Sequence, residues 1–257
     1  MKKLLIMLLV LVMLISVVAC DGKGNGNETS GDETTGGGDV TPTALSYAEY
    51  IAAEEGAKVT IEAYVQATQG WWENKITVYL QDKDGAYFAY ELACAEEDAA
   101  GFTKGRKIRV TGDKAVWNGE IEILNATFEF VEGADTYVAP ATDVTSLLNS
   151  DTLIDHQNKF VSFTGMTVVA KNDEGAVFYY KWDNSGAEGD DLYFDVSDGT
   201  NTYTFTVESY LTGKDSDVYK AVKALNAGDV INMEGFLYWY EGVNPHITSV
   251  TVVTAVQ

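Results

Sequence analysis

The chain has 257 residues, a formal net charge of −22 and two cysteines. A surface this acidic repels nucleic acid and anionic membranes at long range and favours solubility. Two cysteines exclude a multiple-disulfide scaffold, and the length suffices for one large or two small domains.

The first twenty residues have the order of an export signal. Lys2 and Lys3 precede an uninterrupted apolar run from Leu4 to Ala19. This run is shorter than the roughly 20 residues that a membrane-spanning helix needs, and no charged residue follows it at once. The pattern therefore predicts a signal peptide over residues 1–20 that is cleaved after export.

The junction Val17-Val18-Ala19-Cys20 resembles the lipobox of bacterial lipoproteins. That resemblance implies a diacylglycerol on the Cys20 thiol, a membrane partner reached through this lipid, and a location on the outer side of the bacterial cell membrane. The alternative is an ordinary secretory signal with an incidental cysteine. Residues 21–42 are rich in Gly, Asn, Thr and acids, and we expect them to form a disordered tether.

Residues 43–257 contain an internal repeat. Residues 43–61 align with 145–163, and the strand-like run ITVYLQDKDG aligns with a second run that begins at Leu192. Gly105, Gly112 and Gly119 align with Gly228, Gly235 and Gly242, respectively. We therefore predict two related domains, over residues 43–139 and 140–257.

Within each copy, apolar and polar residues mostly alternate, which is typical of half-buried strands. The first copy shows this alternation over residues 58–66, 75–81, 106–112 and 120–131. Short helices are expected before the first strand, over 45–56 and 147–157, and after the third strand, most clearly over 215–228. Asp84-Gly85, Asp198-Gly199 and Asn118-Gly119 are expected to form tight turns.

This order of elements resembles the OB-fold, a five-stranded Greek-key barrel with a helix between its third and fourth strands. The segment YVQATQGWWENKITVYLQDKDGAYFAYELAC is similar to OB-like modules in surface lipoproteins of anaerobic Gram-positive bacteria. The fold class expected is all-β with short helices, as two tandem OB-fold-like barrels. An SH3-like barrel or a small sandwich is the alternative.

No catalytic motif is present, and we expect a noncatalytic protein without a cofactor. The two histidines, His156 and His246, fall on different elements, and Cys94 is expected to be a buried apolar residue. A loop rich in acids and glycines suggests a calcium site, although its spacing does not match an EF-hand and a solvated acidic loop is the alternative. The candidate ligands are Asp183, Glu188, Asp190 and Asp191.

Aromatic residues recur at the loops that border the ligand face of an OB-fold. Such rings can stack on sugars or bases, anchor a protein partner, or close the barrel ends. Tyr79 and Tyr193 fall on the second strand of each copy, opposite in parity to its core positions, and should face the ligand. The full candidate ligand-binding set is Trp71, Trp72, Tyr79, Trp117, Tyr180, Trp182, Tyr193, Tyr238, Trp239 and Tyr240.

The leading functional hypothesis is a surface-displayed, noncatalytic binding module for protein or glycan. The second is binding of single-stranded nucleic acid, which needs a positively charged groove as well as stacking rings. The one local basic cluster, in the first copy, is Lys104, Arg106, Lys107, Arg109 and Lys114. The third hypothesis is a structural or accessory subunit of a surface complex.

Overall fold

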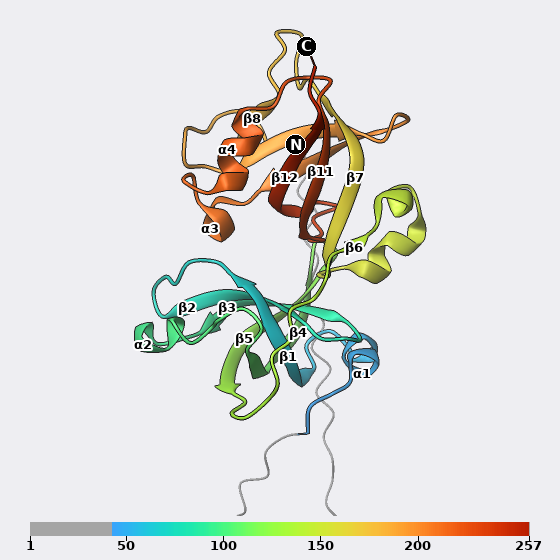
Figure 1. Cartoon of the computed structure of the whole chain (residues 1–257). Coiled ribbons are helices and arrows are strands. Elements are labelled where there is room, and N and C mark those ends of the chain that lie inside the picture. The colour runs from blue at the N-terminus through green and yellow to red at the C-terminus, as the bar shows by residue number, and fades with distance from the viewer. Residues whose placement is uncertain (1–42, 257) are drawn as a thin grey trace, which may run out of the picture. The chain divides into compact units, whose positions relative to one another are not determined.

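The computed structural model describes residues 43–256, which belong to one compact unit, Pro42–Gln257 (Figure 1). The predicted signal peptide, Cys20 and the tether lie outside the described residues. Within 43–256, no helix has both the length and the apolar character needed to span a membrane.

The first half forms a closed barrel in the order β1-β2-β3-β5-β4. Its first strand pairs antiparallel with β4, and β3 pairs with β5 in parallel. This closure, with one parallel pair, is the Greek-key topology of an OB-fold. Its elements are α1 (Tyr47–Ala52), β1 (Lys58–Thr68), β2 (Lys75–Gln81), β3 (Ala86–Ala93), α2 (Glu96–Ala99), β4 (Lys107–Trp117) and β5 (Glu120–Phe130).

The second half repeats this topology. The strands β7, β11, β12, β10 and β9 follow one another around a sheet that the β7–β9 pairing closes, and β10 pairs with β12 in parallel. Two short strands, β6 and β8, extend this sheet. The elements are β6 (Thr142–Asp143), η1 (Thr145–Leu147), η2 (Asp151–His156), β7 (Phe160–Val169), β8 (Phe178–Tyr180), β9 (Leu192–Ser197), β10 (Thr202–Val207), α3 (Ser209–Thr212), α4 (Asp217–Lys223), β11 (Val230–Phe236) and β12 (His246–Thr254).

The fold is therefore mostly β, with two tandem OB-fold-like barrels, as the sequence predicted. Residues paired by the repeat occupy equivalent core positions: Ile61 and Phe163 are fully buried, as are Leu80 and Phe194. The alternation along β4 is also observed, with every second residue buried up to Lys114. Each barrel core is thus filled by one face of each strand, as the period of two requires.

The predicted turns also form. Between β4 and β5, Asn118 and Gly119 have φ angles of 49° and 94°. Two successive positive φ angles are the geometry of a type I′ hairpin turn, which Asn-Gly favours. Between β2 and β3, the Asp82 carboxylate accepts the backbone N–H groups of Asp84 and Gly85 and closes that turn.

Two expectations require correction. The helix expected over 147–157 is not continuous: Leu147 ends the 3₁₀ segment η1, a turn follows, and a second 3₁₀ segment, η2, begins after Ser150, whose side chain caps it by accepting the Thr152 N–H. The sequence places Tyr180 in a loop, yet this residue lies in β8, because its aromatic run pairs with β9. The helix expected over 215–228 is present as α4.

Candidate ligand-binding cleft

The loop between β1 and β2 carries two adjacent tryptophans with different environments. Trp71 packs on the core of the first barrel, and its Nε1 donates a hydrogen bond of 2.9 Å to Cys94 O. Trp72 is 71% exposed. Trp71 is therefore structural, whereas Trp72 is free to contact a ligand.

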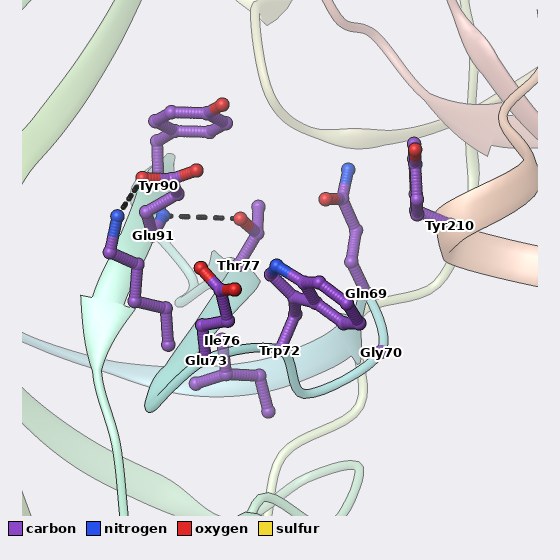
Figure 2. Close-up of a pocket in the computed structure, with 10 residues that line it drawn as sticks. Gln69, Gly70, Trp72, Glu73, Ile76, Thr77, Tyr90, Glu91 and Tyr210 are labelled. Carbon is purple, nitrogen blue, oxygen red and sulfur yellow. Dashed lines mark hydrogen bonds and ion pairs between the residues drawn. The ribbon is translucent and has the colours of Figure 1, made fainter.

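Trp72 borders a cleft of about 550 Å³. Figure 2 shows its ring between the β2–β3 hairpin, which carries Tyr90 and Glu91, and Tyr210 of α3. The aromatic rings of Tyr90 and Tyr210 are exposed as well. The complete lining is Gln69, Gly70, Trp72, Glu73, Lys75, Ile76, Thr77, Tyr90, Glu91 and Tyr210.

The two barrels build this cleft together, and one buried carboxylate joins its walls. Glu208, which is largely buried, accepts hydrogen bonds from Gln69 Nε2 at 3.1 Å and from the Tyr210 N–H at 3.2 Å. The Gly70 N–H also donates to Tyr210 O at 3.0 Å. Burial raises the pKa of Glu208 to about 7. The β1–β2 loop is thus fastened to α3.

The cleft is slightly acidic. Lys75 is the one base among the residues that line it, and its Nζ lies 2.5 Å from Glu91 Oε2. That hydrogen bond raises the pKa of Lys75, with a smaller contribution from the charge of Glu73. The Thr77 hydroxyl accepts the Glu91 N–H at 3.1 Å. The Glu73 carboxylate forms no ion pair within residues 43–256 and is available to a ligand.

Tyr79 faces away from the core of the first barrel, as its parity predicts, but it does not face a ligand. It is 1% exposed, because the second barrel covers it. Its ring stacks on Phe236 with centroids 4.5 Å apart, and its hydroxyl shares a 2.7 Å hydrogen bond with His246 Nδ1. Burial lowers the pKa of His246 to about 3, so this imidazole is neutral. The expectation that Tyr79 contacts a ligand is therefore wrong.

The other candidate aromatics divide by exposure. Tyr180 and Trp239 are partly buried and pack against the core of the second barrel. The Tyr238 ring stacks on the His246 ring, with the ring centroids 4.3 Å apart. Tyr193 is half-buried, and burial raises its pKa to about 12. The exposed members are Trp182, Trp117 and Tyr240, of which the last two pack together with ring centroids 5.1 Å apart. None of these lines the cleft, so the ten candidates do not form one site.

The four candidate calcium ligands do not converge. Glu188 pairs with Lys223 at 2.6 Å, and Asp191 accepts hydrogen bonds from Ser209. Asp183 accepts the backbone N–H of Ser185 within its own turn. No group of three acidic, histidine or cysteine side chains could hold a metal ion within residues 43–256. This geometry does not support the calcium hypothesis.

Four of the five residues in the basic cluster of the first barrel have hydrogen-bonding or ion-pair partners within the chain, and the fifth, Lys104, has its ammonium 5.4 Å from the ring centre of Phe160. Lys107 and Arg109 both pair with Glu62, at 2.7 and 2.5 Å. Arg106 pairs with a glutamate after β5. Lys114 is buried and donates to two backbone carbonyls at the end of α1. These cations are therefore not a free stripe along β4.

Trp72 is the only one of the ten residues lining the cleft that was a sequence candidate; Tyr90 and Tyr210 were missed, as was Glu208, which holds the β1–β2 loop from behind the cleft. Tyr90 lies on β3, where the alternation of inward- and outward-facing residues along the strand could have identified it as outward-facing. Tyr210 and Glu208 come from the other repeat, and the sequence carries no signal that they reach the β1–β2 loop. Only docking of the two barrels brings them there.

No protein-family model and no curated protein matches the sequence. Among solved structures, the chain is similar to the aspartyl tRNA synthetase from Entamoeba histolytica at 18% identity and a TM-score of 0.29, covering 38% of this chain and 22% of the synthetase. It is similar to the p204 HINb domain at 14% identity and a TM-score of 0.36, covering 78% of this chain and 100% of that domain. A murine DNA-binding protein bound to double-stranded DNA is 12% identical over 77% of this chain and 100% of its own, with a TM-score of 0.34.

The strand order and parallel pairings thus place the chain in the class of proteins with tandem OB-fold-like barrels. Its candidate site is the cleft that Trp72, Tyr90 and Tyr210 border. Fold alone does not define what such a site binds, so the ligand is argued from the chemistry of the cleft.

Proposed function

We propose that this protein is a noncatalytic binding module that takes an oligosaccharide in the Trp72 cleft. The observation that carries the proposal is the pair of exposed rings, Trp72 and Tyr210, in a cleft whose single base is already paired. OB-folds bind oligosaccharides as well as oligonucleotides at this part of the barrel.

The chemistry of the lining suits an uncharged polyol. Aromatic faces bury the C–H surface of a sugar ring, while carboxylate and phenol oxygens hydrogen-bond its hydroxyl groups. Glu73, Tyr90 and Tyr210 supply such oxygens around Trp72. An anionic ligand would meet net negative charge here, because Glu73 and Glu91 outnumber Lys75.

Replacing Trp72 with alanine is expected to weaken oligosaccharide binding about 30-fold or more, the effect of removing an aromatic anchor worth about 2 kcal/mol. Trp182→Ala is the matched control, because Trp182 is equally exposed, at 75%, and lies outside the cleft. A glycan array followed by titration calorimetry on a bound sugar would measure both. Equal affinities of the two variants, or no sugar bound at all, would contradict the proposal.

Single-stranded nucleic acid is the second candidate, because exposed aromatic rings on an OB-fold can stack on bases. Some solved structures of similar fold are DNA-bound proteins. The ion pairs of Lys107 and Arg109 weigh against it, because phosphate binding requires free cations. Affinity for a single-stranded oligonucleotide that falls steeply with salt and depends on Trp72 would favour this candidate over sugar.

We also propose that Cys20 anchors the chain by a lipid at the outer side of a bacterial membrane, on the strength of the lipobox resemblance alone. Cys20→Ala should then abolish incorporation of a labelled fatty acid in a bacterial host. The variant should also leave the membrane fraction. Unchanged labelling and fractionation would show that Cys20 is not the anchor.

A further inference from the structure

Tyr210 is held in place by hydrogen bonds of the backbone around it. Asp191 Oδ1 accepts the Ser209 N–H at 2.8 Å and the Ser209 hydroxyl at 2.7 Å. Glu208 Oε1 accepts the Tyr210 N–H at 3.2 Å, and the Thr212 hydroxyl donates to Glu208 O at 3.2 Å. The backbone of α3 is therefore fixed by its own barrel, while Tyr210 remains 75% exposed.

The same segment lies beside the β1–β2 loop of the first barrel. The Gly70 N–H donates to Tyr210 O at 3.0 Å, and Trp72 follows Gly70 by two residues. Two residues span at most about 7 Å, so Trp72 and Tyr210 are carried by neighbouring stretches of backbone. The hydrogen bond between Gln69 and Glu208 joins the same two stretches. One short ligand can therefore reach rings from both barrels.

A third exposed ring borders the cleft, on the other side of Trp72. Tyr90 of β3 is 42% exposed, and its ring stacks on Phe88 with centroids 6.3 Å apart. Phe88 is itself buried against Tyr238 of the second barrel, so the Tyr90 ring has a fixed support. Figure 2 shows Tyr90 on one side of Trp72 and Tyr210 on the other. The cleft thus offers three rings from three parts of the fold.

The size of the cleft and the spread of its rings suit a chain of sugar units. Its volume of about 550 Å³ lies within the range of about 300–1,000 Å³ for sites that enclose most of a drug-sized ligand, which has the size of several linked sugars. Because Tyr90 and Tyr210 flank Trp72 on opposite sides, a chain that runs through the cleft passes all three rings. A single unit stacked on Trp72 does not.

On the basis of the proposed binding of sugar at Trp72, we propose that the ligand is a linear oligosaccharide of at least three units that crosses from the first barrel to the second. Trp72 holds the central unit, Tyr90 holds a unit on the first barrel, and Tyr210 holds a unit on the second. Tyr210 is then the residue that selects for chain length, and the two barrels form one binding site that neither provides alone.

Affinity should rise with chain length because most of the cost of binding falls on the first contact. A ligand loses its translational and rotational freedom once, so a further unit that reaches another ring adds its contact at a small additional ordering cost. One aromatic contact of typical strength changes affinity by about two- to tenfold. The fixed backbone of α3 preserves this gain, since little of it is spent on ordering Tyr210.

Oligosaccharides of graded length test the proposal. Titration calorimetry of the full-length chain with cello-, chito-, xylo- and malto-oligosaccharides of one to six units would give the affinity at each length. In a series that binds, affinity is expected to rise by about two- to tenfold with each ring reached and to level off at three or four units. Tyr210→Ala should lower the affinity for the tetrasaccharide by about that factor, and its effect should shrink as the chain shortens.

Two further variants control for the change at Tyr210. Tyr210→Phe keeps a ring on α3 and should restore the rise with chain length. Trp182→Ala removes a ring that is equally exposed, at 75%, and lies outside the cleft, so it should leave the whole series as in wild type. Neither alanine substitution removes a core side chain, which keeps the comparison free of unfolding.

The possible outcomes distinguish chain-length selection from sugar binding itself. Trp72-dependent binding that is equally tight for one and four units would leave sugar binding intact and overturn the proposal made here. A rise with length that Tyr210→Ala leaves unchanged would overturn it as well. Failure of every series to bind would overturn both. Oligothymidylates bound in place of sugars, with affinity that depends on length and on Tyr210, would overturn both in favour of single-stranded nucleic acid.

Discussion

Replacing Tyr79 with alanine is expected to destabilise the protein by about 3–5 kcal/mol, the range for removing a large buried aromatic side chain. The Tyr79 ring is buried between the rings of Phe88 and Phe236, whose centroids lie 5.0 and 4.5 Å from its own. Its loss would leave a cavity between the barrels and remove the partner of His246 Nδ1. Urea unfolding monitored by tryptophan fluorescence would measure the change.

Tyr79→Phe separates packing from hydrogen bonding. The phenyl ring should retain the stacking on Phe236 but leave His246 Nδ1 unpaired, at a cost of about 1–3 kcal/mol. We expect the alanine variant to lose clearly more stability than the phenylalanine variant. If the alanine variant lost less than about 1 kcal/mol, the ring would not hold the barrels together.

Gly235→Ala is the second substitution with a large expected effect. A Cβ at this position would collide with the carbonyl oxygen of His246 and come within 2.8 Å of the Ile247 Cα, and both are backbone atoms that cannot turn aside. Separating β11 from β12 to make room should cost about 3 kcal/mol, at the upper end of typical overpacking penalties. Thermal unfolding should show a melting temperature lower by roughly 6–12 °C.

Gly70→Ala is the matched control for this substitution. A Cβ at Gly70 would meet no heavy atom within 4 Å, and the residue has no left-handed φ angle, so stability should hardly change. A melting temperature for Gly235→Ala equal to that of Gly70→Ala would mean that the strands can separate at little cost. Gly112, the repeat partner of Gly235, should behave as Gly235 does, because Leu124 O lies 2.6 Å from the place a Cβ would take.

The docking of the barrels has a direct consequence for ligand binding. Part of the β2–β3 surface of the first barrel, where Tyr79 and Phe88 lie, is covered by Phe236 and Tyr238 of the second. The uncovered remainder is the end nearest the β1–β2 loop, where Trp72 and the β3 residue Tyr90 remain exposed. The tandem arrangement therefore moves the available site toward the loop and adds Tyr210 to it.

The barrels themselves could be predicted from local pattern. Alternation along strands such as 58–66 and 120–131, together with Asn118-Gly119 at a hairpin, depends on neighbouring residues and on backbone geometry. The repeated glycines helped to identify the two copies because backbone geometry requires glycine at these positions. At Gly112 and Gly235 a neighbouring strand lies too close for any side chain, so both copies carry glycine there.

The site depended on information that local pattern does not contain. The alternation of residues along the strand correctly predicted that Tyr79 faces away from the core of its own barrel. It could not show that Phe236 and His246 from the other repeat cover this residue. Trp71 and Trp72 are neighbours of identical type, and only the tertiary structure distinguishes the packed ring from the exposed one.

The sequence by itself predicted two features. The OB-like architecture followed from the periodicity of apolar residues, and the structure confirms it. The lipid anchor at Cys20 followed from a motif and stays a prediction. Only the tertiary structure decided where the exposed cleft lies and that Tyr79 is buried, because burial is a property of contacts between residues far apart in the chain.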